Sequence, residues 1–330
     1  MTYFFRKMHL AITFLCTATI SYAYADTNNF SSCDENNECI ACQPSCCGTL
    51  FGGVGIVYWR AFESGLDNCV PTDVTDIVLS DGTVISRFKG KSRDPHFEWN
   101  PGFRVGIGYE FACRNWDIGA LWTSFHSKAH DSNNCGDRIR WNLNFDVVDV
   151  IAGYNANLGS CFLLRPFVGL RGATIDQKLH IGEFSSLSSS SIYSSSFSTY
   201  SSLIGNISKE RFSGIGPLIG LEAEWNVFCD FSLYIAASVS WLYGNFNVEL
   251  SQYDEFSYAI DSCRVTKHLN ANVTAGDAEI GIRWQKCFCE NMNVILQFGL
   301  EHHSYFDFNR IGNYGDLSFD GVNFCAIVEY

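Results

Sequence analysis

Residues 98–111, EWNPGFRVGIGYEF, alternate between two kinds of side chain over fourteen positions. The odd positions are mostly large and apolar, whereas the even positions are glycine, polar or charged. Successive side chains of a β-strand point to opposite faces of a sheet, so this period of two predicts a strand. Strands of soluble sheets usually contain about 5–6 residues, but a strand that crosses a bilayer needs roughly 9–11. The length of the alternation therefore predicts a strand whose apolar face meets lipid.

Nine further segments show similar patterns, so we expect ten long strands. With the first, they are 52–62, 98–111, 116–127, 139–147, 162–175, 213–227, 231–243, 278–284, 292–302 and 319–330. Their connections alternate strictly between long and short, which is typical of up-and-down barrels with short periplasmic turns and long outer loops. The first strand should pair with the last, because lipid leaves no partner for an open sheet edge. The expected fold class is thus all-β, a closed antiparallel up-and-down transmembrane β-barrel of about ten strands.

Two segments leave details of this barrel open. Residues 76–86 read as a hairpin within an outer loop, but as a pair of wall strands they would raise the count to twelve. Residues 146–154 shift their apolar side chains from odd to even positions, which predicts a bulge or a strand end near Asp149.

The amino terminus predicts export. Arg6 and Lys7 precede an apolar stretch at 10–20 and a small-residue cleavage site at 23–25, so residues 1–25 read as a signal peptide. A lipoprotein site at Cys16 is the alternative. Beyond residue 25 no run of eighteen apolar residues occurs, and we expect no transmembrane helix. The net charge of −13, without a basic stripe, argues against nucleic acid as a partner.

Several motifs also carry a family resemblance. Residues 57–67, 97–111, 116–127, 164–177 and 232–246 resemble the pore-forming outer-membrane protein family of legionella- and chlamydia-type bacteria. The resemblance implies a barrel in the bacterial outer membrane with porin activity, and it brings neither catalytic residues nor cofactors. Outer-membrane lipid and the outer-membrane assembly machinery are the expected partners. The high cysteine count and a serine tract depart from the family's pattern.

The inward positions of the predicted strands carry charges of both signs. A pore passing small ions or solutes would be lined by these residues: Arg104, Asp117, Arg140, Asp146, Arg165, Arg171, Glu222, Glu224, Glu279, Arg283 and Glu301. The alternative is an ion-paired interior that closes a narrow barrel, since eight strands already leave a lumen that side chains fill. The rival function is a disulfide-linked structural protein or a surface adhesin without a conducting pore.

Most cysteines map to the periplasmic side of the expected barrel. These disulfide candidates are Cys33, Cys39, Cys42, Cys46, Cys47, Cys113, Cys161, Cys229, Cys287 and Cys289. The first five fall in a cysteine-rich periplasmic segment, 26–50, ahead of the barrel at 51–330. The periplasm is oxidising, so disulfides are expected, within the chain or to other copies and envelope proteins. A zinc site at 39–42 and 287–289 is the alternative, and no metal is the prediction.

The carboxyl terminus, a serine-rich tract and a few histidines carry further predictions. Phe324, Val328 and Tyr330 form an alternating apolar carboxyl end that predicts an assembly signal. The serine-rich tract 185–202 reads as a flexible outer loop, with an adhesive loop as the alternative. His302 and His303, with Glu301, lie near the outer end of the expected strand 292–302, where a barrel enzyme could keep a catalytic dyad. His126 and His130 are equally well explained as rim residues. No nucleophile motif accompanies them, so the expectation is that the protein is not an enzyme.

Overall fold

The computed structural model describes residues 48–65, 74–78, 84–88, 97–112, 115–132, 138–159, 161–190, 197–228, 230–254, 263–289, 292–310 and 315–330. The chain divides into two units, Met1–Glu38 and Cys39–Tyr330, and all the described residues belong to the second. The predicted signal peptide and residues 26–47 of the cysteine-rich segment lie outside the described ranges. Within those ranges, no helix has the length and hydropathy needed to span a membrane.

The regular elements of the described unit are β-strands. They are β1 (Thr49–Glu63), β2 (Val74–Val78), β3 (Val84–Phe88), β4 (Trp99–Glu110), β5 (Trp116–Ser132), β6 (Arg138–Tyr154), β7 (Ala156–Asn157), β8 (Phe162–Ser190), β9 (Phe197–Phe228), β10 (Phe231–Asp254), β11 (Cys263–Cys289), β12 (Met292–Asn309) and β13 (Gly315–Glu329).

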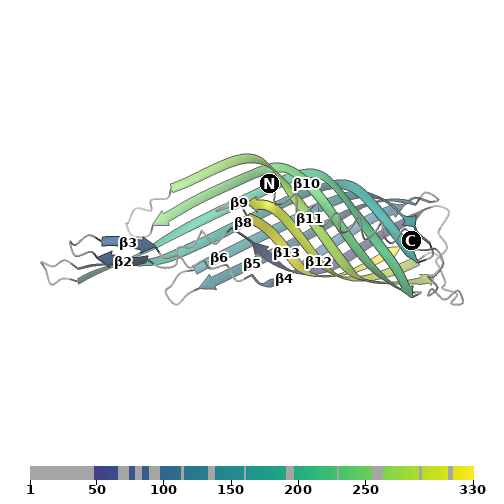
Figure 1. Cartoon of the computed structure of the whole chain (residues 1–330), viewed down its shortest axis with the longest axis horizontal. Helices are drawn as coiled ribbons and strands as arrows, with labels where there is room; N and C mark the ends of the chain where they lie inside the picture. The colour runs from purple at the N-terminus through teal and green to yellow at the C-terminus, as the bar shows by residue number, and fades with distance from the viewer. Residues whose placement is uncertain are drawn as a thin grey trace. The chain divides into compact units, whose positions relative to one another are not determined.

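Ten of these strands form one closed antiparallel barrel. Each long strand pairs with the next along the chain from β4 to β13, leaving out the two-residue β7, and β1 lies between β4 and β13 (Figure 1). The first and last strands meet as predicted, and the backbone N–H groups of Leu50 and Tyr330 donate to each other's carbonyl oxygens at 2.9 and 2.8 Å. Strands β2 and β3 form a separate hairpin, so the twelve-stranded alternative was wrong.

Several strands run much further than the sequence predicts. Strand β8 pairs with β9 from Phe162↔Trp225 to Ser190↔Phe197, so Ser185–Ser190 and 197–202 are strand backbone. The prediction of a flexible loop was therefore wrong for these residues, while 191–196 lie outside the described ranges. Serine has no apolar side chain to bury, but the backbone ladder that begins in the barrel can continue through it, because both of its partners are main-chain groups.

The polarity of the two barrel faces inverts along β6. In β6, the outward Val148 and Val150 are 47% and 45% exposed, whereas Phe145 and Val147 are buried in the interior. The pairing of β6 with β5 and β8 runs through this point without a register shift, so the predicted bulge near Asp149 was wrong. The strand stays regular near Asp149, but the environment of its outward side chains changes there. These side chains contact lipid on one side of Asp149 and water on the other.

A real irregularity occurs in β12. Asp307 has a positive φ of 52°, and the pairing with β13 shifts register between Tyr305 and Asn309. The Asp307 backbone N–H donates to the Asp316 carboxylate at 2.8 Å, which holds this bulge in place. The two extra residues of β12 let both Tyr305 and Phe308 face the interior, where each is fully buried.

The interior of the outer half is filled by aromatic side chains. Trp59, Phe125, Phe145, Tyr305 and Phe319 come from five strands, and Phe145 lies 4.6 Å from Phe319 and 5.5 Å from Tyr305 between ring centroids. Phe212, Phe246 and Phe308 extend the group, with Tyr305 and Phe308 6.3 Å apart. We call these eight residues the aromatic plug. Each aromatic pair contributes about 0.5–1.5 kcal/mol beyond its area burial, so the plug also holds opposite walls together.

Candidate functional site: the charged lumen

The inward side chains between the plug and the short turns are mostly polar. Strand pairing explains why, because on these rungs the outward positions face lipid and are apolar, which leaves the alternate positions for polar residues. The outward residues include Val105, Ile118, Val168, Ile219 and Ile280, all of them exposed on the barrel wall. Charges placed inside such a wall need partners, because an unpaired buried charge is very costly.

One ion-pair network lies near the short turns. Arg165 bonds Asp117 through Nε and Nη2 at 2.8 and 2.5 Å, and its Nη1 reaches Glu222 at 3.3 Å. Arg283 bonds the other oxygen of Glu222 at 2.8 Å and also pairs with Glu224. These five side chains come from β5, β8, β9 and β11, so the network crosses the lumen. We call it the turn-side network.

A second ion-pair network lies beneath the plug, and we call it the outer network. Arg104 pairs with Glu301 at 3.0 Å, and Glu301 also accepts the Trp59 indole N–H at 2.7 Å. His303 contacts Glu301 through Nε2 at 3.2 Å and Asp277 through Nδ1 at 2.7 Å. Trp59 thus joins this network to the aromatic plug.

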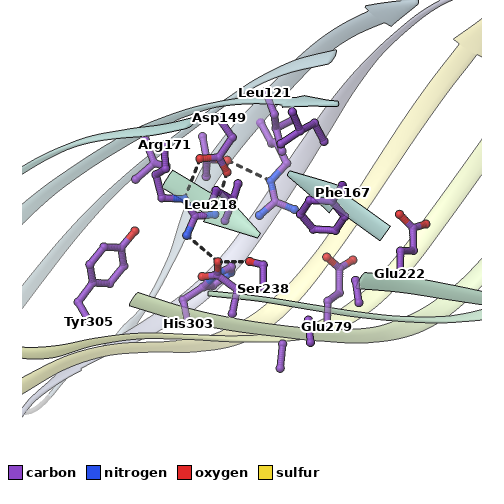
Figure 2. A pocket seen from close by; sticks show the side chains of 18 of the residues that line it. Leu121, Asp149, Phe167, Arg171, Leu218, Glu222, Ser238, Glu279, His303 and Tyr305 are labelled. Carbon is purple, nitrogen blue, oxygen red and sulfur yellow. Dashed lines mark hydrogen bonds and ion pairs between the residues drawn. The ribbon is translucent and has the colours of Figure 1, made fainter. Parts of the chain in front are cut away.

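The outer network continues to the opposite wall. Arg171 bonds Asp277 at 2.6 Å and holds Asp149 with two bonds of 2.7 and 2.8 Å (Figure 2). Asp277 also accepts a hydrogen bond from the Ser238 hydroxyl at 2.7 Å. Both oxygens of Asp277 and of Asp149 are therefore occupied, which is how buried carboxylates remain stable in a site with little water.

A cavity of about 210 Å³ lies among these groups. Figure 2 shows Arg171, Glu222, Glu279 and His303 around it, with Leu218 and Phe167 supplying apolar wall. Trp59, Phe145 and Tyr305 of the plug also line it. The cavity has room for several water molecules, and its polar lining supplies their hydrogen-bond partners.

Acidic groups outnumber basic groups in the set formed by the two networks and Glu279. Glu279 accepts hydrogen bonds from Tyr234 at 2.5 Å, Asn323 at 2.8 Å and Gln297 at 2.9 Å, which are neutral donors. The set comprises the carboxyl groups of Asp117, Asp149, Glu222, Glu224, Asp277, Glu279 and Glu301 and the guanidinium groups of Arg104, Arg165, Arg171 and Arg283, with His303. Carboxyl groups therefore outnumber basic side chains in this set.

The structure places most of the predicted lining residues inside the barrel. The inward ones are Arg104, Asp117, Arg165, Arg171, Glu222, Glu224, Glu279, Arg283 and Glu301. The inward placement of Arg140 and Asp146 was wrong. They pair in register with the outward His180 and Thr174 of β8, and they lie on the outer half, where water surrounds the wall and the apolar side chains fill the interior.

Three members of the outer network were not among the predicted lining residues. Asp149 was predicted as the position of a bulge or strand end, and Asp277 directly precedes the expected strand 278–284. His303 was considered only as a partner of Glu301 in a catalytic dyad. Parity along each strand could have found them, since Asp277 lies two residues before Glu279 and His303 two residues after Glu301. His302 points to the outside instead, where its imidazole contacts Asp320 at 2.5 Å, so the adjacent histidines do not share a site.

The remaining predicted sites are partly described. Cys161 and Cys287, both beside short turns, are disulfide-bonded, and Cys325 is a free thiol buried in β13. The cysteines at 33, 39, 42, 46, 47, 113 and 229, and the side chain at 289, lie outside the described residues. Phe324, Val328 and Tyr330 of the predicted assembly signal all face outward and are exposed.

A closed barrel with an apolar outer face and a polar interior on the same rungs defines an outer-membrane β-barrel protein. The family described as Legionella pneumophila major outer membrane protein precursor matches residues 51–321. This chain belongs to that family, and its location is the bacterial outer membrane.

Comparisons with other proteins return distant likenesses. The outer membrane protease OmpT from Escherichia coli aligns with 14% identity and a TM-score of 0.39, over 88% of this chain and 99% of that one. The toluene transporter TodX of P. putida aligns with 10% identity and a TM-score of 0.25, over 86% and 89% of the two chains. No curated protein matches the chain.

Proposed function

We propose that the protein is a porin-like barrel that passes small cations, and that its lumen is closed at rest by the aromatic plug. One observation carries this proposal: an acidic lumen with a cavity of about 210 Å³ lies beside a group of buried aromatic rings. The polar groups from the turn-side network to the outer network provide successive binding positions for a cation. The plug then limits passage to brief openings, because hydrated ions do not cross packed apolar side chains.

The cation preference rests on the acidic excess of the lumen. A cation near Glu279 meets a carboxylate whose hydrogen-bond donors are neutral, whereas an anion meets guanidinium groups already held by carboxylates such as Asp149 and Asp117. Rings of acidic side chains favour cations in channels in the same way. We therefore expect small, infrequent and cation-preferring current steps.

Planar-bilayer recording on refolded protein tests the proposal. Folding is first verified by heat-modifiable gel mobility, and the reversal potential is then measured under a salt gradient. A reversal potential displaced toward that of the cation supports the proposal. Steps without cation preference would reject the assigned selectivity, and complete silence from verified barrels would reject conduction.

Silence would favour a second candidate, a structural or surface-presenting barrel. The specific observation behind it is the length of β8 and β9, which continue for about twenty residues past the last lipid-facing positions, Leu170 and Ile215. The paired strands thus extend the sheet well past the lipid-facing wall, whether or not the lumen conducts.

A further inference from the structure

The outward face of β5, β6, β8, β9 and β10 changes from apolar to polar along one row of paired residues. The last apolar positions, Trp122, Val148, Ile215 and Tyr243, occupy a single row of the sheet, which passes through Gly172 of β8. The next outward row consists of Ser124, Asp146, Thr174, Ser213 and Asn245. The outer boundary of the hydrocarbon layer therefore lies between these rows.

Basic side chains gather on the same face beyond this boundary. Lys128, Asn142, Lys178 and Lys209 lie side by side in one row, and Arg140 and His180 are paired in the row beyond. We call Lys128, Arg140, Lys178, His180 and Lys209 the basic face; it spans the adjacent strands β5, β6, β8 and β9 (Figure 1). Burial, together with the positive charges of Lys178, Arg140 and Lys209, lowers the pKa of His180, which agrees with their close grouping.

Few acidic groups balance this face. Lys209 pairs with Glu249 at 3.3 Å, and the neighbouring Arg211 pairs with Asp176 at 2.5 Å. In the part of the chain that the structure describes, no carboxylate lies within salt-bridge distance of Lys128, Arg140 or Lys178. In a chain with a net charge of −13, three adjacent unpaired bases need an explanation outside the protein itself.

We propose that the basic face binds the phosphorylated saccharide headgroups of outer-leaflet glycolipids. Its position directly above the lipid-facing wall argues for a lipid, and its charge argues for phosphate, with which an arginine such as Arg140 forms bidentate hydrogen bonds. The distance of the basic face from the hydrocarbon boundary argues for the saccharide. The six residues from Trp122 to Lys128 rise about 20 Å along the strand, or roughly 15 Å along the barrel axis. A simple phospholipid headgroup layer is only about 5–8 Å thick.

The test compares two double variants of the folded barrel. Arg140→Gln/Lys178→Gln removes two bases from the basic face, and Lys267→Gln/Lys286→Gln removes two exposed bases from β11. The probes are lipopolysaccharide with a phosphorylated core, the same lipid after dephosphorylation, and heparin as a soluble polyanion. Binding to detergent-solubilised barrels is measured at low and high salt, after heat-modifiable mobility has verified folding.

We expect the first variant to bind the phosphorylated lipid about tenfold more weakly, and the control variant to bind it like the wild type. High salt and dephosphorylation should each reduce wild-type binding as well, an expectation that holds even if a variant fails to fold. Equal lipid binding by the wild type and the first variant would overturn the proposal. So would a loss of heparin binding alone, which would assign the face to a soluble polyanion.

Discussion

At the scale of the residue, position along a strand decides which side chain the interior accepts. Arg171 and Ile175 both point inward from β8 and lie only four residues apart. Arg171 bridges Asp149 and Asp277 in the lumen, whereas Ile175 belongs to the apolar core of the outer half. A short distance along the strand thus separates a buried ion-pair network from packed apolar side chains. The charged groups need hydrogen-bond partners, and the apolar groups need close packing.

Removal of Arg171 should be far more damaging than removal of an exposed arginine. Arg171→Ala leaves Asp149 and Asp277 facing each other without their shared cation, and we expect it to lower the free energy of unfolding by about 3–5 kcal/mol. Arg211→Ala, which breaks an exposed pair with Asp176, should cost about 0–1 kcal/mol. Urea unfolding in lipid vesicles measures both, and equal losses would contradict the assigned network.

Two buried carboxyl groups in the outer half predict a pH dependence of stability. Burial and then the charge of Glu210 raise the pKa of Glu63 to about 8, although the Trp141 indole N–H donates a hydrogen bond to this carboxyl group at 2.9 Å. Burial raises the pKa of Glu210 to about 7, opposed by the backbone N–H and charge of Arg310. Both values exceed the ordinary 4.5, so the stability from this pair is fully present below about pH 4.5 and falls as pH rises through 7 to 8.

The variant Glu63→Gln tests this linkage. Urea midpoints measured between acidic and mildly alkaline pH should decline with pH in the wild type and decline less in the variant. Glu98→Gln changes an exposed carboxyl group and should leave the decline as it is. A wild-type midpoint that rises with pH in this window would contradict the assignment.

At the scale of the element, the sequence predicts where strands lie better than how far they reach. The alternation of β4 and the order of loop lengths predict ten strands and the closure of β1 on β13, because lipid demands both an apolar face and a closed ladder. The same alternation misleads in β6, where Trp141 and Phe145 are as apolar as lipid-facing residues but fill the interior. The order of side chains along one strand does not reveal which face contacts water.

The charged lumen could be predicted in part for the same reason. Charges on strands inside the membrane layer must point inward, so Arg104 and Glu222 follow from parity alone. Charges on Arg140 and Asp146 do not, because those positions lie outside the lipid. The bulge at Asp307 and the partners of each ion pair depend on contacts between distant strands, which one sequence does not reveal.

Arginine substitutions on β8 test the position of the membrane boundary. Val168 and Thr174 share the outward face of one strand, on opposite sides of the proposed boundary. Val168→Arg places a charge in lipid and should cost about 2–4 kcal/mol, whereas Thr174→Arg should cost about 0–1 kcal/mol. Unfolding in phospholipid vesicles measures both, and a larger loss at Thr174 would place the boundary elsewhere.

At the scale of the whole molecule, we propose that the periplasmic cysteines link barrels or envelope proteins covalently. Cys161 and Cys287 show that disulfide bonds form beside the short turns. The barrel does not need them for closure, because the ladder already pairs the backbone hydrogen-bonding groups of its strands. Non-reducing electrophoresis of native membranes, with thiols blocked before lysis, should give species larger than the monomer that reductant collapses. Migration as a monomer without reductant would restrict the bonds to single chains.

We propose that the aromatic plug, above the polar lumen, closes the barrel. Phe319 and Phe324 lie on the same strand, but Phe319 is fully buried in the plug and Phe324 is 48% exposed on the lipid-facing wall. Single-channel recording of Phe319→Ala, Phe324→Ala and the wild type tests the claim most directly. Phe319→Ala should open more often or with larger steps, while Phe324→Ala stays at the wild-type level; equal currents from all three folded barrels would contradict the account.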